Sequence, residues 1–282
     1  MPRLTPGLLS TARSAFHQAL LAGPLTKTSE GVLSIADEGN TRSQRLSAHI
    51  ASRLGAVRTA KKRPGQTLGD EFEALVAIFL QNTFLKLDHL RPGTWNIVHS
   101  PGAIAQFEQY MHLASLMALV REHPEVEASL GGDYLIKPDI VISRQPEPDS
   151  VLNKVGVIVD SVAPARAPLR QTNNAHPLLH ASISCKWTLR SDRSQNSRTE
   201  ALNLIRNRKG RVPHAVVVTA EPLPSRLASI ALGTGDLDCV YHFALPELLE
   251  ACENEHDTDA LKVLIDGKRL RDIADLPLDL AI

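Results

Sequence analysis

The chain has 282 residues and a mass of 30.7 kDa, enough for one large domain or two of ordinary size. Hydrophobic residues make up 43% and charged residues 22%, as in soluble globular proteins, which excludes a disordered or collagen-like chain. Equal numbers of basic and acidic residues, 31 of each, disfavour a protein that coats nucleic acids non-specifically. No run approaches the roughly 18 apolar residues of a membrane helix, and Pro6 and Arg13 argue against a secretory signal.

The first third of the chain is expected to be helical. Residues 1–66 predict short helices broken by Gly and Pro. A longer helix is expected to begin near Thr67, which would serve as its N-cap. Its apolar stripe at helical spacing comprises Leu68, Phe72, Leu75, Val76 and Phe79. Another helical pattern covers residues 103–122.

The middle of the chain predicts strands. Residues 138–142 form a short apolar run that ends in a polar, Pro-rich turn, and residues 155–159 are expected to form a partner strand. After a loop over 164–176, the run 178–187 alternates apolar with polar side chains. This period of two places Ser182, Ser184 and Lys186 on one face of the strand.

The last third predicts a helix over 197–209, a buried strand over 214–219, a short strand over 240–244 and closing helices. The order of elements indicates an α/β fold with a central mixed β-sheet flanked by helices. We expect a single domain over 1–282. It would comprise a helical N-terminal part (1–66), a catalytic core (67–245) and a C-terminal helical part (246–282).

Charge is unevenly distributed although the total is zero. Residues 186–211 contain eight Lys or Arg against two acids, whereas residues 247–282 contain ten acids against four bases. The first segment predicts a local site for a polyanion, with a solvated helix face as an equally good alternative. The three cysteines, Cys185, Cys239 and Cys252, lack metal-ligand spacing, which suits a reducing cytoplasm and argues against a disulfide scaffold or structural zinc.

Four residues form a candidate catalytic set. Hydrolysis of a phosphodiester requires carboxylates that hold Mg²⁺ and a cation near the scissile phosphate. Asp139 heads one predicted strand and Lys186 ends another, so they would meet if the two strands are neighbours. Glu200, near the start of the next predicted helix, and Glu73 could add carboxylates. Taken singly, each has an ordinary structural explanation, such as a protected strand edge or a helix-dipole acid.

The order Pro138-Asp139, Ser184-Cys185-Lys186, Glu200 resembles the rearranged PD-(D/E)xK nuclease pattern. In that form a Glu from the following helix replaces the acid two residues before the Lys. Residues 178–226 closely resemble the NgoMIV-like type II restriction endonucleases, the CCGG-recognising group of this superfamily. The similarity extends over nearly the whole chain, including residues 63–67, 72–73 and 267–280, and implies a restriction-endonuclease-like core.

The resemblance implies a role for each member of the set. Asp139 would be the central metal ligand, and Cys185 would contribute its backbone carbonyl. Lys186 would orient the attacking water and stabilise charge on the phosphate. Glu200 would complete the metal site, and Glu73 would assist from outside the ligands.

The resemblance also implies residues that contact DNA. Arg190, Ser191, Asp192 and Arg193 would reach the major groove. Arg pairs with guanine and Asp accepts a hydrogen bond from cytosine, so this set suits a core of G·C pairs such as CCGG. The residues implied at the outer base pair are Gln66, Arg226 and Asp37. Members of the family assemble as tetramers of two back-to-back dimers, and a palindromic site itself favours two-fold symmetry.

The main hypothesis is therefore a Mg²⁺-dependent endonuclease that cuts double-stranded DNA at a palindrome with a CCGG core, with GCCGGC as the expected site. A non-catalytic DNA-binding protein and a structure-selective nuclease are the alternatives. A cysteine hydrolase that uses Cys185 and His180 is disfavoured, because residues five apart on one strand face opposite sides of the sheet.

Overall fold

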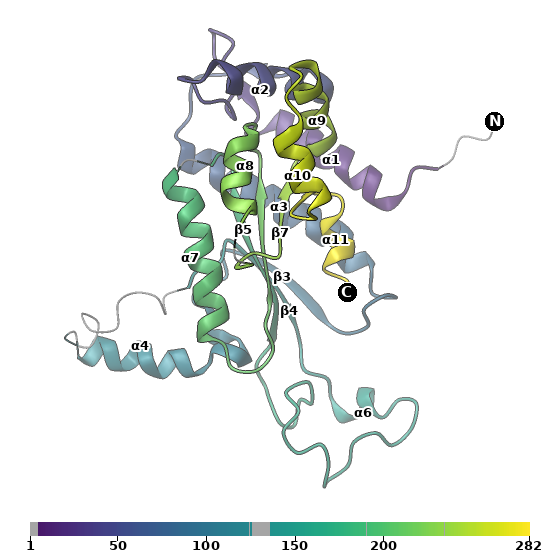
Figure 1. Cartoon of the computed structure of the whole chain (residues 1–282). Helices are drawn as coiled ribbons and strands as arrows, with labels where there is room; N and C mark the ends of the chain where they lie inside the picture. The colour runs from purple at the N-terminus through teal and green to yellow at the C-terminus, as the bar shows by residue number, and fades with distance from the viewer. Residues whose placement is uncertain (1–4, 124, 126–135, 190, 234) are drawn as a thin grey trace.

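The computed structural model describes residues 5–123, 125, 136–189, 191–233 and 235–282 (Figure 1). A six-stranded mixed sheet forms the centre, with strand order β3-β4-β5-β6-β7-β8. The strands are β3 (Trp95–His99), β4 (Ile140–Arg144), β5 (Leu178–Lys186), β6 (His214–Thr219), β7 (Cys239–His242) and β8 (Leu270–Asp272). The α/β fold with a central mixed sheet between helices is thus confirmed. None of the helices in the described part combines the length and apolar character needed to cross a membrane.

The register of the sheet places two ends of strands together. β4 is antiparallel to β3 and β5, whereas β5, β6, β7 and β8 are mutually parallel. Ile140 at the start of β4 lies opposite Ile183 of β5, and Lys186 at the end of β5 lies opposite Thr219 of β6. The residue that precedes β4 and the residue that ends β5 therefore lie at the same edge of the sheet.

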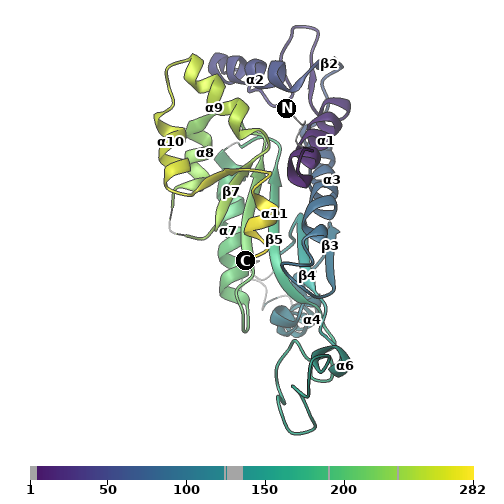
Figure 2. The same ribbon diagram turned by 90° about the vertical axis from the view of Figure 1, so that its right-hand side faces the viewer.

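Helices cover both faces of the sheet (Figure 2). On one face α3 (Gly65–Thr83) packs against β3 and β5 and is backed by α1 (Leu8–Ala22). On the other face α7 (Ser191–Asn207) packs on β6, α8 (Pro224–Ala231) on β7, and α10 (Asp259–Asp266) on α8. The other helices in the described part of the chain are α2 (Thr41–Leu54), α4 (His112–Glu122), α6 (Asp149–Leu152), α9 (Leu245–Asn254) and α11 (Leu276–Asp279), with 3-10 turns η1 (Phe84–Lys86), η2 (Ile104–Gln106) and η3 (Glu108–Tyr110).

The apolar stripe predicted for α3 faces the core. Phe72 and Val76 are fully buried, and Phe72 contacts both Phe16 of α1 and Trp187 just after β5. The predicted N-cap at Thr67 is wrong: the helix begins at Gly65, with Pro64 in the capping position. Proline there lacks a backbone N–H that would go unpaired anyway, and its restricted φ suits the entry into a helix.

Two other boundaries differ from the predictions. The helix expected over 197–209 is α7, which begins six residues earlier, at Ser191. The helical pattern over 103–122 is divided into η2, η3 and α4. The helical N-terminal part contains α1 and α2 as expected, and also a short parallel pair, β1 (Thr26–Lys27) and β2 (Arg58–Thr59). The strands β3 and β8 were not predicted.

The strand expected over 155–159 is wrong. These residues lie in an arm, residues 145–177, which extends from one end of the sheet and contains α6 (Figures 1 and 2). Val155 and Val157 are 89% and 86% exposed, so this alternating apolar run has no sheet to pack on. An ion pair of 2.6 Å between Arg170 and Asp149 holds the arm together. The true partners of β4 are β3 and β5.

Candidate active site and DNA interface

Asp139 and Lys186 meet at the edge of the sheet where β4 begins and β5 ends. The Lys186 ammonium donates to Asp139 Oδ2 at 3.0 Å, and the Cys185 backbone N–H donates to the same oxygen at 2.7 Å. Both side chains are largely buried, Lys186 16% and Asp139 20% exposed. The two strands, whose pairing the sequence left open, are neighbours. Their pairing places a carboxylate and a cation side by side, as phosphodiester hydrolysis requires.

Neighbouring charges keep Lys186 protonated. Burial alone would lower the pKa of this ammonium, but the carboxylates of Asp139 and Glu200 outweigh burial and raise its pKa above the usual value. Lys186 is therefore a permanent cation at neutral pH. It can attract a phosphate and hold a water molecule by hydrogen bonding.

Helix α7 brings Glu200 to the same place. Burial raises the pKa of Glu200, Lys186 opposes this rise, and the charge of Asp139 adds to it. Lys186, Asp139 and Ser184, all at this end of the sheet, act on the Glu200 carboxyl, which therefore lies on the side of α7 that faces the sheet. Because α7 begins at Ser191, Glu200 lies in the third turn and not in the first, so a role in balancing the helix dipole does not explain it. The hydroxyls of Ser184 on β5 and Ser197 on α7 lie 3.3 Å apart and join the two elements.

Helix α3 contributes Glu73 from the other side. Burial raises the pKa of Glu73 to about 7, with a further contribution from the charge of Asp139. His99, the last residue of β3, lies with Nε2 3.3 Å from Glu73 Oε2 and acts in the opposite direction. His99 was missed from the sequence. Its signal is the β-branched pair Ile97-Val98 between Gly93 and Pro101, which marks a short strand.

The oxygen atoms gathered here suit a divalent cation. Among the described side chains, no three from His, Cys, Asp or Glu converge closely enough to form a ready-made metal site. The donors available are the carboxylates of Asp139 and Glu200 and the backbone carbonyl of Cys185, all of them hard ligands of the kind that Mg²⁺ prefers. Burial raises the pKa of both Glu73 and Glu200, and the negative charge of Asp139 raises both further. The three carboxylates therefore repel one another. A cation among them would relieve that repulsion.

The thiol of Cys185 does not serve as a nucleophile in this arrangement. Burial raises the pKa of Cys185 well above the usual value, which keeps the thiol protonated and unreactive. His180 is buried and bonds to the carbonyl of Leu280 through Nε2 at 2.8 Å. Cys185 and His180 are five residues apart on β5 and so face opposite sides of the sheet, which disfavours a cysteine hydrolase.

Two of the three residues assigned to an outer base pair lie together beside the catalytic set. Asp37 and Arg226 form a direct ion pair, and both line a cavity of about 410 Å³. The cavity is also lined by Lys62, by Trp187 and by Thr188, the last two directly following Lys186. Gln66, in the first turn of α3, is exposed and donates to Asp70 at 2.7 Å. The neighbouring Gly65 lines the cavity.

The residues expected to read the inner bases are only partly described. Arg190 lies outside the described residues. Ser191, Asp192 and Arg193 form the first turn of α7, but their side chains also lie outside the described part. The backbone places this turn after Leu189, at the same end of the sheet as Lys186 and Asp139.

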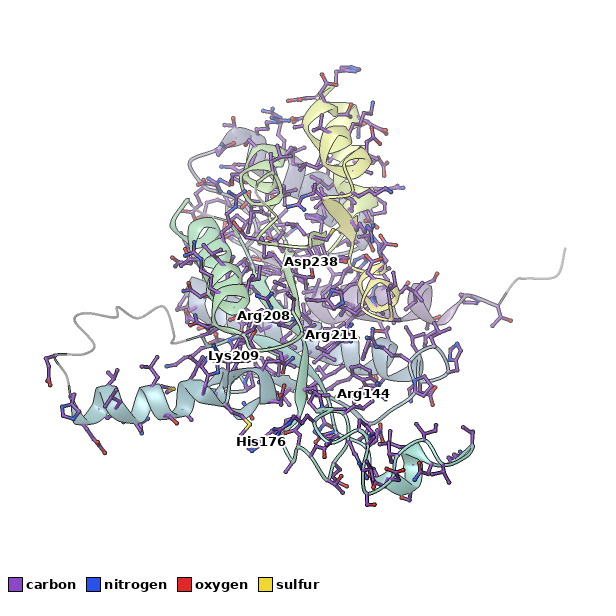
Figure 3. The ribbon with its side chains drawn as sticks, turned by 60° about the horizontal axis from the view of Figure 1, so that its bottom comes forward. Arg144, His176, Arg208, Lys209, Arg211 and Asp238 are labelled. Atoms are coloured by element: carbon purple, nitrogen blue, oxygen red, sulfur yellow. The ribbon has the colours of Figure 1, made fainter. Side chains whose placement is uncertain are left out.

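The basic segment 186–211 does not form one surface. Because α7 runs antiparallel to β5 and β6, its C-terminal end lies at the opposite end of the sheet from Lys186. Figure 3 shows Arg208, Lys209 and Arg211 at this far end, with Arg144 and His176. The nine residues of β5 separate the two ends by about 26 Å, at about 3.3 Å per residue. The single polyanion site predicted from charge is therefore divided into two clusters.

The mixed sheet, with a carboxylate and a lysine meeting where β4 begins and β5 ends, defines the class of restriction-endonuclease-like proteins. Residues 16–282 match the NgoMIV restriction enzyme family. The chain is also 50% identical to the type II restriction enzyme NgoMIV of Neisseria gonorrhoeae over 283 aligned residues, which cover 98% of this chain and 99% of that protein. The chain belongs to the NgoMIV restriction enzyme family, and its activity is that of a type II restriction enzyme, a site-specific deoxyribonuclease.

Proposed function

We propose that this enzyme cuts double-stranded DNA at GCCGGC, a palindrome with a CCGG core, by Mg²⁺-dependent hydrolysis. The observation that carries the proposal is the contact of Asp139 with Lys186 and Cys185, with Glu200 on the adjacent helix. Membership of the family supports DNA as the substrate.

The residues have the following roles in the proposed reaction. Asp139, Glu200 and the carbonyl of Cys185 hold Mg²⁺, which supplies positive charge to the scissile phosphate when it is bound. Lys186 donates hydrogen bonds that orient the attacking water and stabilise the extra negative charge of the transition state. The water oxygen bonds to phosphorus as the bond to the 3′-oxygen breaks, leaving a 5′-phosphate and a 3′-hydroxyl. Glu73, held by His99, assists from α3.

Base recognition is assigned to two groups of residues. Arg190, Ser191, Asp192 and Arg193 read the inner G·C pairs, since two guanidinium groups and one carboxylate match guanine and cytosine in the major groove. The outer pair is assigned to Gln66, Arg226 and Asp37. The cavity that Asp37 and Arg226 help to line supports this assignment, because Trp187, the residue after Lys186, also lines it.

We further infer a single-domain subunit that assembles into a homotetramer, a dimer of two dimers, in the cytoplasm. A palindrome presents its half-site twice and so favours a two-fold dimer. The arm supports further assembly, because an exposed group of apolar side chains is typical of an interface. These side chains are Val155, Val157, Ile158 and Val162.

A plasmid digest tests the proposal. The plasmid is incubated with the enzyme in Mg²⁺ or in EDTA, and the ends of the fragments are sequenced. Discrete fragments with CCGG-centred ends, formed only with Mg²⁺, are expected. Asp139→Ala should bind the site but not cut it, and cutting by this variant at the wild-type rate would refute the assignment of the active site.

The same digest separates the alternatives. A plasmid left intact in Mg²⁺, although the protein binds it, would favour a non-catalytic DNA-binding protein. Cleavage restricted to branched substrates would favour a structure-selective nuclease. Random nicking would leave the catalytic set in place and contradict the proposed base recognition.

A further inference from the structure

Glu221 is an acidic residue buried completely between the two parts of the proposed DNA interface. It lies in the segment that joins β6 to α8 and has no exposed surface. Its Oε2 accepts the backbone N–H of Leu189 at 2.7 Å, and its Oε1 accepts the backbone N–H of Leu223 at 3.1 Å. Arg226 Nη1 lies 3.6 Å from Oε2. One carboxylate thus contacts three points of the chain.

A buried carboxylate is an expensive way to stabilise a fold. The loss of hydration costs several kcal/mol, and a buried ion pair often adds no stability over well-packed apolar side chains. Burial raises the pKa of Glu221, whereas the Leu189 amide and Arg226 oppose that rise. The buried carboxylate of Glu221 is therefore better explained by the positions of the groups it contacts than by a gain in stability.

The guanidinium of Arg226 lies between two acids of different character. Its Nη1 faces Glu221, which is wholly buried, and its Nη2 pairs with Asp37, whose side chain is 32% exposed at the cavity. A DNA base entering the cavity can compete for the contact with Asp37 but cannot reach Glu221. Glu221 therefore fixes one side of the guanidinium and leaves the other side available for binding.

The hydrogen bond from the Leu189 backbone to Glu221 fixes the chain just before α7. Leu189 is itself buried and directly precedes Arg190, the first residue of the run 190–193 assigned to the inner bases. The hydrogen bond to its N–H anchors the chain at this point. The same carboxylate thus contacts Arg226 and the residue that directly precedes the run 190–193.

We propose that Glu221 is a positioning residue for sequence specificity: it sets Arg226 and the chain entering residues 190–193 in a fixed relation to each other. This inference rests on the proposed function, because it takes the assigned base-reading residues as its starting point. Fixed hydrogen-bonding groups discriminate between bases because the wrong base leaves them unpaired.

The test compares Glu221→Gln with Glu247→Gln as a matched control. Glu247 is also a largely buried carboxylate, which pairs with Arg13, away from the cavity. Each protein is titrated in EDTA with three duplexes: GCCGGC, ACCGGT with changed outer pairs, and GCGCGC with a changed core. The ratios of the dissociation constants measure discrimination, and thermal melting measures stability separately. Cleavage of the same three duplexes in Mg²⁺ gives a second measure of discrimination.

Glu221→Gln should lose discrimination against the changed outer pairs by about 10- to 100-fold, the usual effect of a hydrogen bond to a charged group. The substituted amide has only one acceptor oxygen and presents N–H groups to donors. Glu247→Gln should keep the wild-type ratios even if it melts at a lower temperature. Arg226→Lys provides a second variant if Glu221→Gln does not fold, and it should show the same loss, because an ammonium lacks the fork that faces both acids.

Unchanged ratios in Glu221→Gln or in Arg226→Lys would overturn the proposal. So would an equal loss of affinity for all three duplexes, which indicates a structural role alone. If the wild-type protein itself fails to distinguish the duplexes, the proposed function fails instead, and the two failures are therefore separable.

Discussion

Replacing Glu73 by Gln should stabilise the protein at pH 8 and leave its stability nearly unchanged at pH 5. Burial, with the charge of Asp139, raises the pKa of Glu73 from 4.5 to about 7 in the folded state. As the pH rises between these values, the unfolded chain ionises Glu73 while the folded chain keeps it protonated. The fold therefore loses stability over this interval, at about 1.4 kcal/mol per pH unit, and the loss stays constant above pH 7.

Over the full interval from pH 4.5 to about pH 7, the folded state loses about 3 kcal/mol of stability. Glutamine does not ionise, so the variant avoids this loss. A weaker contact with His99 offsets part of this gain, so we expect a net increase of about 1–3 kcal/mol in the free energy of unfolding at pH 8. Urea denaturation in EDTA at pH 5 and pH 8 measures it.

Glu71→Gln is the control for the Glu73 variant. Glu71 lies on the same helix but is 39% exposed and pairs with Arg63 at the surface. Its replacement should change the stability by no more than about 1 kcal/mol and should not stabilise the protein at pH 8. A Glu73→Gln protein that is no more stable than wild type at pH 8, or equally stabilised at pH 5, would refute the explanation from burial and charge.

Two further predictions concern cleavage and assembly. Lys186→Met should lower the single-turnover cleavage rate by about 100-fold or more, because it removes the cation placed for the transition state, while DNA binding in EDTA is retained. A rate within tenfold of wild type would contradict the role of Lys186. Val157→Asp, in the exposed part of the arm, should reduce the proposed tetramer to dimers in sedimentation velocity without lowering the melting temperature. Tetramers that persist unchanged would exclude Val157 from the interface.

The central strands of the fold could be predicted because their patterns are local. The alternation in β5 identified the face that carries Ser184 and Lys186, and the continuous apolar run of β6 identified a strand covered on both sides. The meeting of Asp139 with Lys186 was conditional on the two strands being neighbours, which no local pattern decides. The contact at 3.0 Å supplies that missing information.

The wrong predictions come from local patterns that do not show whether a segment packs against the rest of the protein. The alternating apolar residues at 155–159 would fit a half-buried strand, yet only Val159 is buried, because the arm leaves the body of the protein. The first six residues of α7 are polar and carry no apolar stripe, so the start of the helix was invisible. Glu221 and His99 matter through contacts with distant residues, and the sequence gives little sign of those contacts.

Trp187 makes the end of the sheet that carries Lys186 observable by fluorescence. Its indole is 2% exposed, donates to the carbonyl of Ser34 at 3.1 Å, and lies 5.2 Å from the ring of Phe72. The other tryptophan, Trp95, lies near the far end of β5 beside His180. With Trp95 replaced by Phe, the emission would come from a single fluorophore, one residue from Lys186. The emission of Trp187 depends on its contacts with Ser34 of the N-terminal part and Phe72 of α3. A change in its emission when DNA is added would therefore report a change in this packing, without an attached label.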